Sequence, residues 1–72
     1  MTRSVLVTGG SGYFGSILAE MALARGDRVR VFDLNPPTDD RVDYVAGDVR
    51  HLGALQEACD GVDVVLNNVA QV

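Results

Sequence analysis

The sequence predicts an α/β fold: part of a Rossmann fold, with a parallel sheet of about four strands in the order 3-2-1-4 and helices on both faces. Short apolar runs that do not alternate with polar residues are typical of strands buried on both faces, and residues 4–8 form the first of them. Segments with apolar residues at helical spacing alternate with these runs, which favours parallel strands joined by right-handed crossovers. A cluster of glycines at residues 9–15 joins the first run to the first helical segment.

The first half of the chain contains two strands around one helix. Residues 4–8 form the first strand, and the helix spans residue 13 to about residue 25. Gly26 is placed to end this helix, because glycine readily adopts the left-handed conformation of a helix cap. The second strand covers residues 29–32 and ends at Asp33. The helical spacing predicts that one apolar stripe faces the sheet, formed by Phe14, Ile17, Leu18, Met21 and Ala22.

The second half repeats the pattern after a loop. Residues 35–40 form the loop, because two prolines remove backbone donors and the rest of the segment is polar. Residues 43–46 predict a short third strand, and residues 62–66 a fourth. Between them a helix runs from near residue 52 to residue 59, and His51 before it is a poor N-terminal cap. The residues of this helix expected to face inward are Leu52, Leu55 and Ala58 or Cys59.

The glycine cluster fits two nucleotide-binding patterns at once. Gly10, Gly12 and Gly15 satisfy G-x-G-x-x-G, while Gly9 with the last two satisfies G-x-x-G-x-x-G. In either pattern one glycine makes the turn, one leaves room for a pyrophosphate, and Gly15 lets the helix lie close to the strand. The free amides at the start of the helix and the positive end of its dipole favour a phosphate. A turn with a purely structural role is the alternative explanation of the same glycines.

Asp33 is the second candidate binding residue. It follows Gly15 by 18 residues and ends the second strand. An acidic residue at that place accepts a hydrogen bond from the adenosine ribose of NAD and repels the 2′-phosphate of NADP. The sequence therefore predicts a dinucleotide cofactor, with NAD preferred over NADP. The alternative is an aspartate that only forms the turn before the loop.

Composition excludes several other classes of function. The 72 residues suffice for one domain at most, and ten acidic residues against six arginines and no lysine leave a net charge of −4. This balance argues against nucleic acid or an anionic membrane as the partner. Cys59 is the only cysteine and His51 the only histidine, so neither an internal disulfide nor a metal site is expected. No targeting or membrane-spanning segment is evident, which makes the cytoplasm the expected location.

The segment Val-Thr-Gly-Gly-Ser-Gly-Tyr-Phe-Gly at residues 7–15 resembles the amino-terminal signature of the extended short-chain dehydrogenase/reductase family. This family includes the NAD-dependent nucleotide-sugar epimerases and dehydratases. Residues 46–50 and 63–72 resemble two later stretches of the family, so the resemblance covers essentially the whole chain. The resemblance implies Gly9, Ser11, Gly12, Tyr13, Phe14 and Gly15 around the pyrophosphate, Asp33, Leu34 and Asn35 around the adenine ribose, Asp48 and Val49 at the adenine, and Asn68, Val69 and Ala70 along the inner ribose.

The same resemblance implies catalytic residues that these 72 positions do not contain. The family's Tyr-x-x-x-Lys pair and its Ser or Thr would lie beyond residue 72. Tyr13 and Tyr44 have no lysine four positions on, so neither is a credible general acid or base. Asn67, where the family often has histidine, and His51, where it often has an acidic residue, are further departures. We therefore expect residues 1–72 to be the amino-terminal half of an NAD(P)-binding domain, with the catalytic and substrate-binding parts absent and no turnover by this chain alone.

Other interpretations stay open from the sequence. A non-catalytic NAD(P)-sensing or regulatory module would share the glycine turn, and a purely structural α/β unit would share the elements. A methyltransferase is disfavoured, because those enzymes usually carry an acidic residue where this chain has Thr8. A nucleotide-sugar substrate is expected only for a longer parent protein. The apolar fourth strand would form an edge of the sheet, which predicts self-association or pairing with the missing half.

Overall fold

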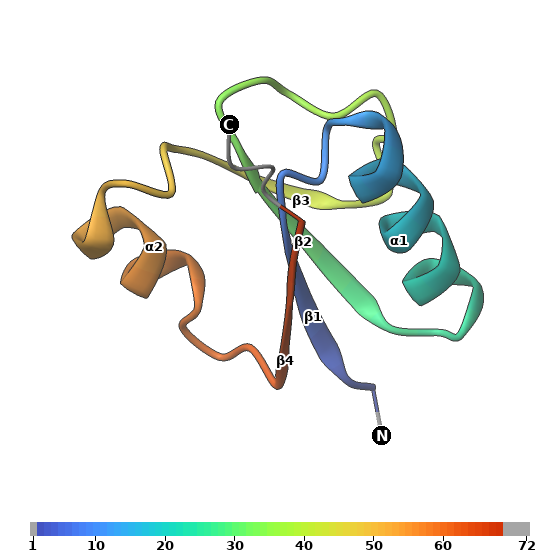
Figure 1. Ribbon diagram of the computed structural model, residues 1–72. Coiled ribbons are helices and arrows are strands. Elements are labelled where there is room, and N and C mark those ends of the chain that lie inside the picture. Colours follow the sequence, from blue (N-terminus) through green and yellow to red (C-terminus); the bar gives the residue numbers. More distant parts are fainter. Residues whose placement is uncertain (1, 69–72) are drawn as a thin grey trace.

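The computed structural model describes residues 2–68, which form a four-stranded sheet with one helix on each face (Figure 1). This confirms the predicted α/β class. The elements in chain order are β1 (Ser4–Thr8), α1 (Tyr13–Ala24), β2 (Arg28–Asp33), β3 (Asp43–Ala46), α2 (Leu52–Ala58) and β4 (Val64–Asn67).

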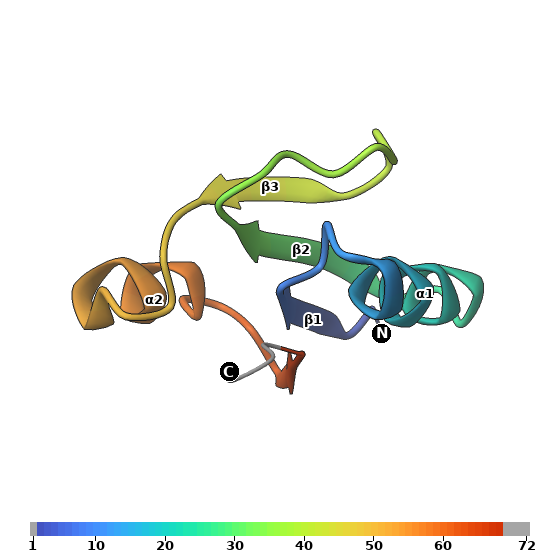
Figure 2. The same cartoon turned by 45° about the horizontal axis from the view of Figure 1, so that its top comes forward.

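All strand pairs are parallel, and the strand order is β3-β2-β1-β4, as the sequence predicts (Figure 2). In the centre of the sheet Val5 pairs with Val29 on one side and with Val64 on the other. This register brings the carboxyl ends of all four strands to the same edge of the sheet. The glycine turn, which follows β1, lies at that edge (Figure 1).

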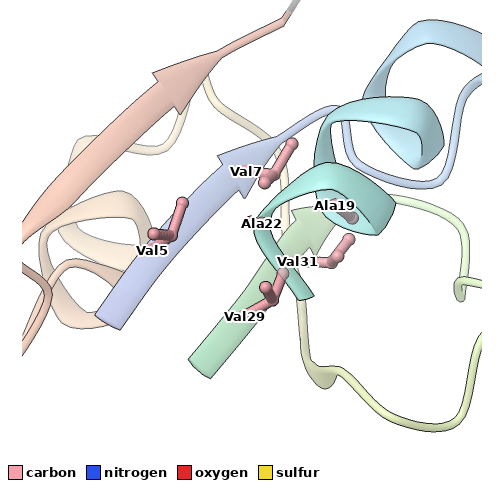
Figure 3. Packing of buried hydrophobic residues seen from close by; sticks show 6 residues of the cluster. All are labelled: Val5, Val7, Ala19, Ala22, Val29 and Val31. Carbon is pink, nitrogen blue, oxygen red and sulfur yellow. The ribbon is translucent and has the colours of Figure 1, made fainter. Parts of the chain in front are cut away.

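The face of the sheet beneath α1 forms one hydrophobic core. Valines of β1 and β2 pack against Ala19 and Ala22 of α1 (Figure 3). The alanines carry little side chain, so the helix axis lies close to the sheet and the valines fill the space between them. The valines of this cluster are Val5, Val7, Val29 and Val31.

The predicted apolar stripe of α1 is wrong in three of its five positions. Phe14, Ile17 and Met21 are 68%, 42% and 59% exposed, respectively. Ala22 is buried and Leu18 packs at the margin of the core, as expected. The buried face instead consists of small residues, Gly15, Ala19 and Ala22, because only these allow the close approach of helix and sheet. The larger apolar side chains therefore lie along one flank of the helix.

The opposite face of the sheet packs on α2. Leu6 and Phe32 are fully buried against Ala58, with Leu55 and Cys59 at the margin. Leu52 is 66% exposed, so its predicted inward position is wrong. The physical reason is that α2 has only seven residues and buries only its last one.

The two ends of α2 differ in how they are stabilised. The Arg30 guanidinium donates to the carbonyl oxygens of Ala58 and Asp60, at 2.7 and 3.0 Å, and so satisfies carbonyls at the end of α2. His51 precedes α2 without a side-chain capping bond, as expected. The fourth strand starts two residues later than predicted, because Val62 donates its amide to the carbonyl of Cys59 and belongs to the turn after α2.

Candidate nucleotide-binding site

The turn between β1 and α1 depends on a glycine with positive φ. Gly9 has φ of 68°, a conformation that side chains disfavour. Its amide donates to the carbonyl of Phe32 at 2.9 Å, and its carbonyl accepts from the amide of Gly12 at 3.2 Å. The first bond attaches the turn to the end of β2, and the second folds the chain back into α1.

Gly10 and Gly15 are required for packing. A Cβ atom on Gly15 would collide with the carbonyl oxygen of Gly9, and one on Gly10 would lie 2.8 Å from both methyl groups of Val31. Gly9, which begins one of the two patterns, supplies the turn, and Gly10, which begins the other, allows the turn to pack directly on Val31. Gly12 differs, because a Cβ atom there would meet only the Gly9 oxygen, at an ordinary 3.5 Å. The fold itself does not require a glycine at position 12.

The first turn of α1 presents amide donors that the described residues leave unpaired. Gly12 is the N-terminal cap and offers no side chain, and its carbonyl accepts from Ser16 at 2.9 Å. Among residues 2–68 no group accepts a hydrogen bond from the amides of Tyr13, Phe14 and Gly15. These donors and the helix dipole fit a diphosphate, which the bare backbone at Gly12 leaves room to approach.

The Asp33 carboxylate lies beside this turn. Its Oδ2 atom accepts from the amide of Ser11 at 3.0 Å, and its Oδ1 atom accepts from the amide of Asn35 at 3.0 Å. The Ser11 hydroxyl donates to the carbonyl of Asn35 at 2.6 Å. Leu34 is exposed between them. The structure therefore brings together the residues predicted for the pyrophosphate and those predicted for the adenine ribose.

Asp48 and Val49 follow β3 at the same edge of the sheet. The amide of Gly47 donates to the carbonyl of Asp33 at 3.1 Å, which ties this segment to the end of β2. The Asp48 carboxylate accepts from the guanidinium of Arg50, at 2.7 Å for the shortest bond, and from the Arg50 amide at 2.9 Å. These bonds, the guanidinium first, lower the pKa of Asp48 to about 2. Val49 packs its side chain against the core on the α2 side.

The end of β4 is joined to the end of β1 through Thr8. Thr8 is only 2% exposed, and its hydroxyl donates to the Asn67 side-chain oxygen at 2.6 Å. The amide of Asn68 donates to the carbonyl and the hydroxyl of Thr8, at 3.1 and 3.2 Å. Asn68 therefore lies directly beside the start of the glycine turn. Val69 and Ala70, also predicted for the site, lie outside the described residues.

Several of these contacts were not predicted from the sequence. The bond between Ser11 and Asn35 and the bond between Thr8 and Asn67 each join distant segments, and no local pattern indicates them. A polar residue at the end of an otherwise apolar strand was the available signal for Thr8. The Asp-x-Arg spacing was the available signal for the ion pair of Asp48.

The two tyrosines of the chain lie near this edge of the sheet. Tyr44 donates its hydroxyl to the carbonyl of Asp33 at 3.2 Å, and Tyr13 is exposed at the first turn of α1. Within residues 2–68 no group of three or more His, Cys, Asp or Glu side chains is placed to hold a metal ion. Neither described helix combines the length and the hydrophobicity needed to cross a lipid bilayer.

Comparison with known proteins identifies the family. The family model for the NAD-dependent epimerase/dehydratase family matches residues 5–72. The chain belongs to the NAD-dependent epimerase/dehydratase family. NAD is the cofactor that the family's description names, and the glycine turn and Asp33 lie within the matched residues. The family membership inferred from residues 7–15 is thereby confirmed.

Members and neighbours of this family align with nearly the whole chain. An uncharacterized protein, y4nG, of Sinorhizobium fredii is 45% identical over all of the chain and 19% of its own length. A 3β-hydroxysteroid dehydrogenase/Δ5→4-isomerase of Mycobacterium tuberculosis is 36% identical over 92% of the chain and 19% of its own length. A short-chain dehydrogenase/reductase from Agrobacterium tumefaciens, crystallised with bound NAD, superposes with a TM-score of 0.86 at 33% identity, covering 97% of the chain and 21% of that structure.

The chain spans about one fifth of the length of the curated relatives it matches, 19% for both of the two above. The part it shares with these family members contains the glycine turn and the carboxyl ends of β1, β2 and β4. The remaining four fifths of the relatives have no counterpart among these 72 residues.

Proposed function

We propose that residues 1–72 form the NAD-binding amino-terminal half of an NAD-dependent nucleotide-sugar epimerase or dehydratase. One observation carries the proposal: the unpaired amides at the start of α1 lie beside the Asp33 carboxylate. The Ser11 amide, in the glycine turn, donates to this carboxylate at 3.0 Å. A diphosphate needs backbone donors, and the adjoining ribose needs an acceptor for its hydroxyl groups. Both requirements are met at neighbouring points of one edge of the sheet.

Each part of the cofactor has a proposed set of partners. The amides of Tyr13 and Phe14 bind the pyrophosphate, with Gly9, Gly12 and Gly15 keeping the backbone accessible and Ser11 alongside. The adenine ribose lies against Asp33, Leu34 and Asn35. The Asn35 amide donates to the Asp33 carboxylate at 3.0 Å, so the carboxylate and the loop form one surface.

The adenine and the inner ribose have their own proposed partners. Asp48 accepts a hydrogen bond from the adenine amino group, since it follows Gly47, whose amide donates to the carbonyl of Asp33 at 3.1 Å and so holds this segment beside the end of β2. The Val49 amide is proposed as a second contact to the base. Asn68, Val69 and Ala70 line the inner ribose, and Asn68 is supported there by its bonds to Thr8.

The preference for NAD over NADP follows from Asp33. A carboxylate accepts from a 2′-hydroxyl and repels a 2′-phosphate. None of the ion pairs among the described residues involves Asp33, so its charge is not neutralised by a neighbouring cation. We infer that NADP binds more weakly than NAD for this reason.

When bound, NAD would supply the hydride acceptor for the oxidation of a substrate carbon. The residues of this chain bind and orient the dinucleotide, while the acid–base pair of the family would lie beyond residue 72. We therefore propose that the 72-residue chain binds cofactor without turnover. A nucleotide-sugar substrate would bind to a longer parent protein.

One other candidate function has a specific observation in its favour. The steroid dehydrogenase of Mycobacterium tuberculosis is 36% identical to this chain, which favours a steroid alcohol as the second candidate substrate class. A non-catalytic NAD(P)-sensing module would share the glycine turn and is a further alternative. The two enzyme candidates require the same hydride chemistry at an alcohol carbon, and all three candidates use the same cofactor site.

Titration of the isotope-labelled 72-residue chain with NAD, followed by nuclear magnetic resonance, tests the cofactor proposal. We expect the largest shift changes at the amides of Tyr13, Phe14 and Asn35, and smaller changes in α2. NADP in the same titration should bind more weakly. Absence of saturable NAD binding, or shift changes confined to α2 and β3, would contradict the proposed site.

We also propose that the isolated chain self-associates or pairs with the missing half of its domain. In β4, Val65 is 47% exposed, and β4 is an edge strand among the described residues. Exposed apolar edge strands favour association through strand pairing. Sedimentation of the chain should reveal dimers or larger species, and Val65→Lys should reduce them. A monomer at millimolar concentration would contradict this expectation.

A further inference from the structure

Three residues at the candidate site form a closed ring of hydrogen bonds. The Ser11 amide donates to Oδ2 of Asp33 at 3.0 Å, and the Asn35 amide donates to Oδ1 of Asp33 at 3.0 Å. The Ser11 hydroxyl donates to the Asn35 carbonyl at 2.6 Å and closes the ring. We call this set of bonds the Ser11–Asp33–Asn35 ring.

The ring orients the carboxylate without using its whole capacity. An ionised carboxylate oxygen has two acceptor directions, and each oxygen of Asp33 accepts one backbone amide. One direction per oxygen is therefore left for another donor. A pair of neighbouring hydroxyl groups, as on a ribose, matches two acceptors held in a fixed orientation.

The Ser11 hydroxyl is the member of the ring that anchors the loop. Asn35 is exposed, and Pro36 and Pro37 follow it. Among the described residues the only hydrogen bonds that hold Asn35 are those of this ring. Its bond to Asp33 spans two residues and moves with the carboxylate, whereas its bond to Ser11 joins it to the glycine turn, which is anchored in the sheet by Gly9.

We propose that Ser11 is a positioning residue that, through Asn35, holds the Asp33 carboxylate in the orientation that binds the adenosine ribose and so contributes to the preference for NAD over NADP. This inference rests on the proposed cofactor site. It assigns the role to the Ser11 hydroxyl rather than to its amide, because every residue at this position supplies an amide.

The test compares three single variants of the 72-residue chain and repeats one of them in an Asp33→Ala background. Ser11→Ala removes the hydroxyl and keeps the amide, and Ser11→Thr keeps both. Ser16→Ala is the matched control, because it removes a hydroxyl that donates to the carbonyl of Tyr13 at 2.7 Å, outside the ring. Calorimetry measures the affinities for NAD and NADP. Hydrogen exchange measures the protection of the Asn35 amide in the absence of cofactor.

Ser11→Ala should weaken NAD binding about fivefold, the effect of one neutral hydrogen bond, and should change NADP binding by less than twofold. The Asn35 amide should exchange about fivefold faster in the same variant. Ser11→Thr should restore both values, and Ser16→Ala should leave both within about twofold of the original chain. In an Asp33→Ala background, Ser11→Ala should have no further effect on NAD affinity, which a general loss of stability would not reproduce.

The outcomes separate this inference from the proposed function. Unchanged Asn35 exchange in Ser11→Ala, or equal losses of NAD and NADP affinity, would overturn the positioning role. If the original chain binds no NAD, the proposed function fails instead, and the exchange rates alone then decide whether the Ser11 hydroxyl holds the loop.

Discussion

The two inner strands and the outer strand β4 differ in how completely the chain covers them. β1 and β2 have a partner strand on each side and a helix on each face, and Leu6, Val31 and Phe32 are fully buried. β4 is paired only with β1 among the described residues, and Val65 is half exposed. The glycine turn and Asp33 lie at the ends of the covered strands. The candidate site is therefore supported by the two strands that this chain covers on both faces and pairs on both sides.

Substitutions of two glycines provide the strongest test of that support. Gly15→Ala should destabilise the chain by about 3 kcal/mol, because its Cβ atom collides with the Gly9 carbonyl. Gly12→Ser should change stability by less than about 0.5 kcal/mol, since position 12 has room for a Cβ atom and serine is a good N-terminal cap. Urea unfolding of both variants measures the difference.

The Gly12→Ser variant also tests cofactor binding separately from the stability of the fold. Gly12→Ser should abolish NAD binding in a folded chain, because its side chain occupies the approach to the unpaired amides of α1. A Gly12→Ser variant that binds NAD normally would remove this position from the site.

Replacing one valine of β2 and one valine of β4 by alanine measures the difference in burial between the two strands directly. Val31→Ala should cost about 2 kcal/mol, because it opens a cavity beneath Gly10 and Ala19 in the core under α1. Val65→Ala should cost about 0.5 kcal/mol, because half of that side chain already contacts solvent. Thermal or urea unfolding provides both values, and equal losses would show that β4 is as well covered as β2.

Charge reversal at the end of β2 alters the site without disturbing the core. Asp33→Arg should weaken NAD binding about tenfold and favour NADP relative to NAD, since an acceptor for a hydroxyl becomes a partner for a phosphate. Competition between the two cofactors in calorimetry measures the ratio. Asp43→Arg, on the exposed side of β3, is the matched control and should leave the ratio unchanged.

Lowering the pH should have the smallest effect on stability, because it acts through two exposed ion pairs. Bonds from the Arg41 guanidinium and amide lower the pKa of Asp39 to about 2, and bonds from Arg50 do the same for Asp48. Because both values lie below the usual aspartate pKa, the folded chain binds fewer protons than the unfolded chain between about pH 4 and pH 2. The stabilisation is therefore complete above about pH 4 and is lost as the pH falls toward 2.

Urea midpoints measured across this pH range check the sign of that effect. Arg41→Gln and Arg50→Gln should each flatten the acid limb of the profile slightly, since solvent screens exposed pairs. A profile that rises toward acid would contradict the assignment of these two ion pairs.

The amino-acid sequence by itself determined the elements and their order, and it predicted the candidate binding residues. Apolar runs without alternation predicted the strands, and the spacing from Gly15 to Asp33 indicated a dinucleotide site from the sequence pattern alone. These features are local, because a glycine that must adopt positive φ or an aspartate that ends a strand can be recognised from its immediate neighbours.

Only the tertiary structure decided which face of α1 is buried and how the site is held together. Helical spacing favoured Phe14 and Met21 as core residues, but the close approach of the helix to the sheet selected Ala19 and Ala22. The bonds of Ser11 to Asn35 and of Thr8 to Asn67 join residues 24 and 59 positions apart. Such contacts depend on where whole elements lie relative to one another, and no local pattern in the sequence encodes that distance.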